Sequence, residues 1–297
     1  MKKERLTGYL MGSIAYLLWG FLPLYWKLIN CITPQEILAH RILWSLGFIF
    51  VILLLKKDWR WLSKLRNPRL WLLYTVSALL VSVNWFTYIW AVNNSHTVDA
   101  SLGYFINPLF SVFLGVVFLH EKLAFPEVIA VLLALCGVIF LTIWFHSLPW
   151  VAIVLTITFG LYGLIKKQGF LDGIQSLGLE TAIIFFPTLY YIIRLQITGQ
   201  AGFLHHGIKT DLLLFAAGAI TATPLLLFGQ AARKIPLSTL GFLQYLAPTF
   251  QFLIGVLVFK EQFQLPRLIG FSIIWLALII FTSSRLSSLK RETLPVK

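Results

Sequence analysis

Charged side chains are scarce in this sequence: Asp, Glu, Lys and Arg together make up 12% of its 297 residues. Soluble domains carry about 25%. Hydrophobic residues make up 59% of the chain, and its mean hydropathy is +0.85. This composition excludes an ordinary soluble protein and predicts a chain that lies in a lipid bilayer.

Acidic residues are rarer than basic ones, at 11 against 24, so the formal net charge is +13. On a soluble chain an excess of this size would suggest a nucleic-acid partner. Here, apolar runs of about twenty residues separate the basic residues from one another. The sequence therefore predicts a lipid environment and no nucleic-acid partner.

Cysteine is almost absent. Cys31 and Cys136 occur in different apolar segments without the spacing of metal ligands, which excludes a disulfide framework and a zinc site. We expect both to be buried, unreactive thiols. The phosphate-binding loop of ATPases, the His-Glu-x-x-His motif and the Gly-x-Ser-x-Gly motif are missing as well. The sequence therefore predicts no enzyme, cofactor or metal, and any driving force would be a gradient of solute, proton or another ion.

The apolar residues are gathered into ten runs, each close to the 20 or so residues that a helix needs to cross a bilayer. This pattern predicts an all-α integral membrane protein with ten transmembrane helices. The expected spans are 7–29, 35–55, 70–92, 99–119, 124–144, 148–165, 176–196, 211–232, 238–259 and 265–284. The first run is too long for a signal peptide and reads as an uncleaved span.

The distribution of Lys and Arg predicts the orientation of the chain. If the N-terminus is cytoplasmic, 18 of the 24 basic residues lie in cytoplasmic segments and five at the outer ends of the spans. We therefore expect both termini in the cytoplasm, as an even number of spans requires.

The sequence resembles itself at an offset of 140 residues. Pro108 aligns with Pro248, Gly115 with Gly255, Glu121 with Glu261 and Pro126 with Pro266. A series in one register indicates a duplication, with repeats over 1–146 and 147–297. Five spans in each half would force the second half to enter the membrane from the opposite side. The fold would then be two inverted repeats, the arrangement of many secondary transporters, with a substrate site near the membrane midplane.

Two charged residues, Arg41 and Glu180, stand out well inside the expected spans. Arg41 lies about 9 Å into the second span, next to His40 and one turn after Glu36, and Glu180 lies at a similar depth in the seventh. One hypothesis makes His40, Arg41 and Glu180 polar stations along a substrate pathway, with Glu180 and Glu36 as candidates for ion coupling. The alternatives are a snorkelling Arg41 with a local contact to Glu36, and a Glu180 held by a neighbouring backbone or a cytoplasmic Lys. We expect no direct pairing of Glu180 with His40 or Arg41.

Further candidates for the pathway are amide, phenol and indole groups within the spans, although each could equally hold helices together. They are Asn84, Asn93, Asn107, Gln244, Tyr104, Tyr245, Trp44, Trp85 and Trp90. Trp26, Trp71, Trp144 and Trp150 stand at span ends, where interfacial belt residues are expected. Pro108 and Pro248 lie inside corresponding spans, and paired helix breaks of this kind point to a central site.

Several segments resemble the RarD-type proteins of the EamA family, within the drug/metabolite transporter superfamily. They are Glu36–Arg41, Asn84–Trp85, Trp90–Asn94, Ala100–Pro108, Leu179–Glu180, Ser238–Phe242 and Gln244–Tyr245. Asp99 departs from the pattern, because a Glu often stands there. The resemblance covers nearly the whole chain. It implies a bacterial inner-membrane permease or exporter with ten helices in two inverted EamA repeats around a central cavity.

The leading hypothesis is a secondary transporter that moves a small organic metabolite or drug-like solute by alternating access. A membrane scaffold, or a sensor that binds a solute or lipid without net flux, is the second hypothesis. An integral-membrane enzyme is the third. Flux of a solute into liposomes separates the first from the others, and a covalent change in the solute identifies the third.

Overall fold

The structure is a computed structural model that describes every residue except 1, 58, 94–96, 145–149, 261–264 and 292–297. The described part of the chain is built from helices and contains no strand. The elements are α1 (Lys2–Trp26), η1 (Lys27–Ile29), α2 (Pro34–Lys56), η2 (Arg60–Arg66), α3 (Pro68–Asn93), α4 (Thr97–Leu119), α5 (Phe125–Trp144), α6 (Trp150–Gln168), α7 (Gly173–Ile197), α8 (Ile208–Lys234), α9 (Leu237–Gln244), α10 (Leu246–Leu257) and α11 (Leu265–Arg291).

Local signals in the sequence explain where two of these helices begin. The hydroxyl of Thr33 accepts the backbone N–H of Glu36 at the start of α2, and Pro34 supplies the fixed φ that suits a first helical position. At the start of α7, the Asp172 carboxylate accepts backbone N–H groups while the Gln175 side chain accepts the N–H of Asp172. This capping box fixes the point where the chain turns into α7.

Eight helices in the described part of the chain are long and apolar enough to cross a membrane. They correspond to α1, α2, α3, α5, α6, α7, α8 and α11, and the described portion of α4 adds a shorter apolar helix, Gly103–Leu119. The outward surface is also apolar: Leu55 is 78% exposed and Phe186 is 74% exposed. Large exposed apolar faces on most helices are what a bilayer requires of a protein.

The span expected at 238–259 is not one helix. It is divided into α9 and α10, which meet at Tyr245. Pro248 gives the physical reason, because it has no backbone N–H to donate to the carbonyl of Gln244 and therefore interrupts the helical ladder at that point. Pro108, its counterpart in the first half, lies within α4, which continues past it. Of the two predicted helix breaks, the one near Pro248 is therefore observed and the one at Pro108 is not.

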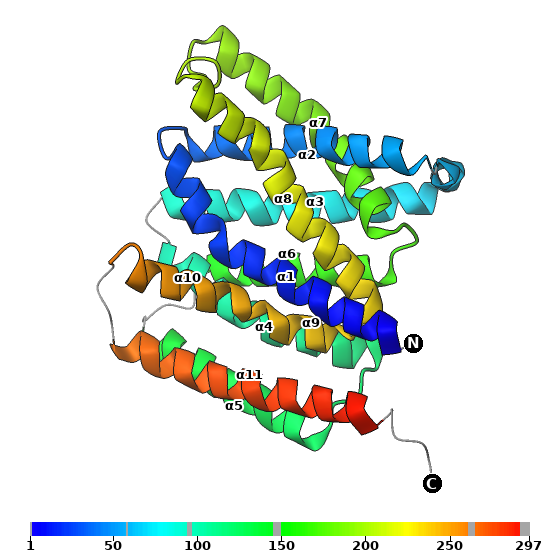
Figure 1. The fold of residues 1–297 in the computed structure, drawn as a ribbon, viewed down its shortest axis with the longest axis vertical. Coiled ribbons are helices and arrows are strands. Elements are labelled where there is room, and N and C mark those ends of the chain that lie inside the picture. The colour runs from blue at the N-terminus through cyan, green and yellow to red at the C-terminus, as the bar shows by residue number, and fades with distance from the viewer. Residues whose placement is uncertain (1, 58, 94–96, 145–149, 261–264, 292–297) are drawn as a thin grey trace.

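The helices of the two halves interleave. In Figure 1, α5 and α11 lie side by side at one end of the molecule and α7 at the other, with α1, α4, α6, α9 and α10 between them. The most extensive packing joins helices of different halves, and these pairs occur in matched sets: α1 packs on α8 as α6 packs on α3, and α1 packs on α10 as α6 packs on α4. The packing of α2 on α8 likewise corresponds to that of α7 on α3.

The spacing of the helices repeats along the chain. Three helices of the first half begin at Pro68, Thr97 and Phe125, and three of the second begin 140 residues later, at Ile208, Leu237 and Leu265. The offset found in the sequence therefore also relates the observed helix starts.

The two cysteines differ from the expectation. Both Cys31 and Cys136 are exposed on the surface of the protein. Cys136 lies on α5, and its neighbours Gly137 and Val138 are the residues buried there. An apolar run in a membrane helix has one face toward lipid and one toward protein, so hydropathy alone did not determine which face each cysteine occupies.

Candidate functional site

A cavity of about 150 Å³, called the central cavity below, lies between helices from both halves of the chain. Its wall is mainly aromatic, with a few amides and one charged side chain. The residues that carry this character are Tyr16, Trp19 and Trp26 of α1, Arg41 of α2, Asn84, Trp85 and Tyr88 of α3, Tyr104 and Asn107 of α4, Phe159 of α6, Gln244 of α9, and Pro248 and Gln251 of α10. A concave apolar pocket with a few convergent polar groups is the usual form of a small-molecule site.

Arg41 is the charged residue of this cavity. Its Nε atom donates to the hydroxyl of Thr221 on α8 at 2.9 Å. The guanidinium lies over the rings of Trp26 and Trp85, at 4.9 and 5.1 Å from the ring centroids. Cation–π contacts with these two indoles help to hold the guanidinium in place within the wall. Arg41 therefore does not snorkel to the surface, the alternative that the sequence had left open.

The amides of the cavity fall into two kinds. Asn84 donates to the carbonyl of Leu155 and to the hydroxyl of Thr158, both at 2.9 Å, and so ties α3 to α6. Asn107 and Gln244 are 3% and 4% exposed, and their side-chain oxygens have no hydrogen-bond partner in the described part of the chain. Buried polar atoms are normally paired, so these two oxygens call for a partner that the protein does not supply.

The helix interruption at Tyr245 shapes the wall. It places Gln244 at the end of α9 and Pro248 in the first turn of α10, and both residues line the cavity. The Tyr245 side chain points elsewhere: it is fully buried, and its hydroxyl donates to the carbonyl of Phe105 on α4 at 3.1 Å. Tyr245 and Phe105 are 140 residues apart, which is the offset at which the sequence resembles itself.

His40, Trp44 and Glu36 form a separate cluster outside the cavity. The Trp44 indole donates to Nδ1 of His40 at 3.1 Å, and Nε2 of His40 is 3.9 Å from the Glu36 carboxylate, the local contact that helical spacing suggested. Glu36 also accepts the backbone N–H groups of Gly202 and Phe203 at 2.9 to 3.0 Å. This cluster fastens the loop between α7 and α8 to α2.

Glu180 lies in a second buried cluster away from the cavity. Its carboxylate is 2.7 Å from the Lys166 ammonium and accepts hydrogen bonds from the hydroxyls of Ser77, at 2.7 Å, and Tyr162, at 3.3 Å. Glu180 is 0% exposed and Lys166 is 4% exposed. The expectation of no contact with His40 or Arg41 is met, and the alternative of a Lys partner is the arrangement observed. Lys166 lies in the last turn of α6.

Trp90 packs against Trp150, with 5.0 Å between ring centroids, and does not line the cavity. Asn93 ends α3, and its side chain lies outside the described residues. Of the predicted pathway residues, the structure thus brings Arg41, Asn84, Trp85, Tyr104, Asn107 and Gln244 to one cavity.

Part of the wall was not anticipated from the sequence. Tyr16, Trp19 and Trp26 come from α1, and Trp26 had been assigned to the membrane interface. These residues and Pro23 follow one another at intervals of three and four, the spacing that puts side chains on one helix face. Aromatic residues at this spacing were the signal that could have identified the α1 wall.

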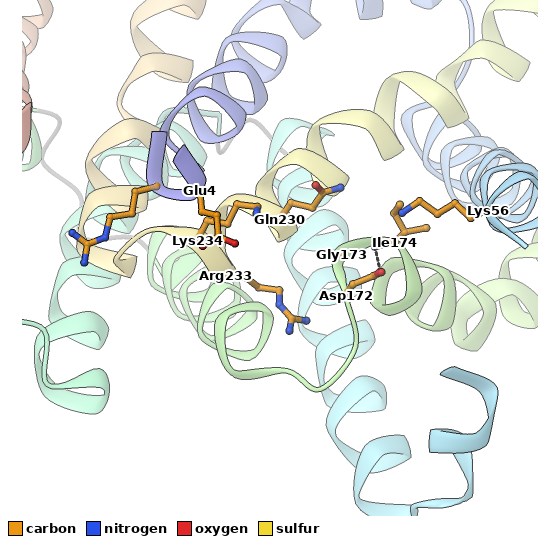
Figure 2. Close-up of a pocket in the computed structure, with 9 residues that line it drawn as sticks. Glu4, Lys56, Asp172, Gly173, Ile174, Gln230, Arg233 and Lys234 are labelled. Carbon is orange, nitrogen blue, oxygen red and sulfur yellow. Dashed lines mark hydrogen bonds between the residues drawn. The ribbon is translucent and has the colours of Figure 1, made fainter. Parts of the chain in front are cut away.

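Larger hollows occur at the surface. Figure 2 shows one of about 530 Å³ lined by Lys56, Arg233 and Lys234 together with Glu4 and Asp172. Asp172 already caps α7, and the Arg233 guanidinium donates to the carbonyl of Leu171. Because Asp172 and Arg233 already have protein partners and none of the described lining residues is aromatic, the smaller central cavity is the better site. Among the described residues, no group of His, Cys, Asp and Glu is placed to hold a metal ion.

Comparisons with known proteins agree with this architecture. Residues 6–143 match the model of the EamA-like transporter family. "Protein RarD" of Streptomyces exfoliatus is 47% identical over 98% of this chain and 93% of that protein. "Uncharacterized transporter YojE" of Bacillus subtilis (strain 168) is 43% identical over 95% of each chain, and "Protein RarD" of Escherichia coli (strain K12) is 38% identical over 98% of this chain and 99% of that one. A solved structure described only as "Crystal structure of protein" shares the fold, with a TM-score of 0.72 at 18% identity, covering 93% of this chain and 97% of that one.

The helices, their apolar surface, the cavity and the relatives together define a multi-pass bacterial membrane transporter. Within that class, the chain belongs to the RarD-type proteins of the EamA family.

Proposed function

We propose that the protein is a secondary transporter that moves a small organic solute across the cytoplasmic membrane by alternating access, with the central cavity as its substrate site. The observation that carries this proposal is the cavity itself, whose wall combines residues of both halves around Arg41. A site at the interface of two repeats is the arrangement expected of a transporter that rocks around its substrate.

The proposed topology has ten spans in two inverted repeats, 1–146 and 147–297, with both termini in the cytoplasm. The matched helix pairs and the repeated helix starts support the duplication. The family match at residues 6–143 covers nearly the whole of the first repeat. The excess of Lys and Arg at one end of the spans supports the orientation. In this topology α9 and α10 together form one interrupted span.

The cavity lies toward the outer half of the proposed topology, since Trp26 is the last residue of α1. The opposite half of α1 packs tightly against α9: a Cβ at Gly12 would lie 3.2 Å from side-chain atoms of both Leu240 and Leu243. Nearby, Glu121 accepts the backbone N–H groups of Leu237, at 2.6 Å, and Ser238, at 2.9 Å. We propose that these contacts close the cytoplasmic side in an outward-facing state and separate during the transport cycle.

The intramembrane carboxylates bear on ion coupling. Glu180 and Glu36 were the candidates, yet both have protein partners and neither lines the cavity. We propose that they fix helices and loops in place and that neither carries the coupling ion. Glu180→Gln protein should then transport with the pH dependence of the wild type. Loss of that dependence, with insertion intact, would return Glu180 to a coupling role.

The function is tested by comparing metabolites inside and outside cells that overproduce the wild type, Arg41→Gln or Arg69→Gln. Arg69 is exposed at the start of α3 and serves as the matched control. We expect a solute whose distribution changes with the wild type and with Arg69→Gln protein, but much less with Arg41→Gln protein. Flux of that solute into liposomes then separates transport from sensing. Binding without flux would support a sensor, and a chemically altered solute would support an enzyme.

A further inference from the structure

Among the described residues that line the central cavity, Arg41 carries a positive charge and none carries an opposing negative charge. Arg41 forms no ion pair with a described carboxylate. Its one hydrogen bond to a described residue is the Nε contact with Thr221. A guanidinium has five N–H donors, so four remain for a ligand. An unpaired cation at this depth is costly unless it meets an anion.

The setting of Arg41 limits the shape of that anion. The rings of Trp26 and Trp85 both lie within cation–π distance of the guanidinium, and the remaining N–H donors lie along its planar edge. The edge of a guanidinium matches a carboxylate, which accepts two parallel hydrogen bonds. A phosphate would bring a second negative charge for which the cavity wall has no second cation. The geometry therefore favours a carboxylate.

A second polar station lies in the same cavity. The side-chain oxygens of Asn107 and Gln244 are buried without a hydrogen-bond partner. They come from α4 of the first half and α9 of the second. A buried acceptor without a donor is unfavourable, so a ligand that supplies an N–H or O–H group would remove this penalty on both helices at once.

The rest of the wall limits the body of the ligand. Aromatic rings of Trp19, Tyr88 and Phe159 provide flat apolar surfaces. A volume of about 150 Å³ is that of a cavity known to hold a single benzene ring. The site as it stands suits a flat body of about one ring and disfavours bulky solutes.

We infer that the substrate is a small organic carboxylate with a flat, ring-sized body and an N–H or O–H donor. Arg41 binds the carboxylate, the aromatic wall holds the body, and Asn107 and Gln244 accept the donor. This assignment rests on the proposed transport function for its physiological meaning, but binding tests it independently of flux.

The test uses 4-hydroxybenzoate and two close analogues, with affinities measured by calorimetry on the purified full-length protein in detergent. In 4-hydroxybenzamide a neutral amide replaces the carboxylate, and benzoate lacks the hydroxyl donor. The wild type should bind 4-hydroxybenzoate about tenfold or more tightly than either analogue, since each analogue leaves one buried polar station unpaired. Similar affinities for the acid and the amide, or no saturable binding of any of the three, would overturn the assignment.

Variants link each preference to its residues. Arg41→Gln should abolish the preference for acid over amide, and Arg41→Lys, which keeps the charge without the planar fork, should retain part of it. Asn107→Leu with Gln244→Leu should abolish the preference for 4-hydroxybenzoate over benzoate. Arg69→Gln should retain both. If Arg41→Gln keeps the full preference for the acid, Arg41 does not bind the carboxylate.

Liposome flux separates this inference from the proposed function. Selective binding of 4-hydroxybenzoate without flux would refute transport and leave the site assignment standing. Flux of 4-hydroxybenzoate and 4-hydroxybenzamide at equal rates would refute the carboxylate assignment and leave transport standing.

Discussion

The Lys166–Glu180 pair joins three helices inside the membrane-spanning body. Glu180 of α7 contacts Lys166 of α6 and Ser77 of α3, each at 2.7 Å, and Tyr162 of α6 at 3.3 Å. Neither charge has access to solvent, since the exposures are 0% and 4%. Removing one partner leaves the other charge buried and uncompensated. Breaking a buried pair in this way costs about 3–5 kcal/mol.

We therefore predict that Lys166→Met and Glu180→Gln each destabilise the protein strongly. The double variant should be more stable than the sum of the two losses predicts, because it leaves no uncompensated charge. Coupling between contacting charges is commonly about 0.5–3 kcal/mol in such cycles. Given the full contact distance and burial, we expect a value in the upper half of that range.

The assay is thermal unfolding of the purified proteins in one mild detergent. At roughly 2 °C or more per kcal/mol, each single variant should melt at least about 6 °C below the wild type. Lys56→Met serves as the control, because Lys56 ends α2 in an exposed position, and surface changes usually stay within about 0.5 kcal/mol. The reasoning is refuted if both single variants melt with the wild type, or if the losses simply add in the double variant.

Three further outcomes are expected. A Cβ at Gly218 would overlap the backbone carbonyl of Trp44 in α2, whereas a Cβ at Gly47 meets nothing within 4 Å. Gly218→Ala should therefore lose about 1–3 kcal/mol of stability by overpacking, and Gly47→Ala should be neutral or gain up to about 1 kcal/mol. Equal melting temperatures for the two variants would contradict the close contact between α2 and α8. Cys31 is exposed between α1 and α2, so a membrane-impermeant maleimide should label intact spheroplasts of the wild type but not Cys31→Ser protein; labelling only after lysis would reverse the proposed orientation. Glu121→Ala removes the acceptor for two N–H groups at the start of α9 and should cost about 0.5–2 kcal/mol, read as a lower melting temperature; an unchanged value would mean that water replaces the carboxylate without loss.

Hydropathy located most of the helices because burial in lipid demands long apolar segments. The run expected at 35–55 corresponds to α2 at Pro34–Lys56, and the run at 124–144 to α5 at Phe125–Trp144. Hydropathy could not predict that the span expected at 238–259 is divided into α9 and α10 at Tyr245. Pro248 signals a lost hydrogen bond in either half, but only packing decides whether a helix tolerates the loss, as α4 does at Pro108.

The site was predicted in part for a similar reason. Arg41, Asn107 and Gln244 stood out because lipid does not tolerate their side chains. Whether such a residue meets a cavity or a protein partner depends on helix rotation, which hydropathy does not specify. Glu180 met Lys166, and Trp26 turned toward Arg41 instead of the interface. Both contacts depend on a partner from another helix, so the sequence pattern of a single helix could not predict them.

The hydrogen bond from Tyr245 to the carbonyl of Phe105 joins positions that correspond in the two proposed repeats. Phe105 has no hydroxyl with which to return the bond, so the contact is made in one direction only, with the hydroxyl from the second half and the carbonyl from the first. The two halves therefore differ at this contact. They also differ in helix geometry there, because α4 is one continuous helix whereas α9 and α10 are two helices that meet at Tyr245. Under the proposed alternating access, the outward-open and inward-open states are therefore not related by symmetry at this residue pair.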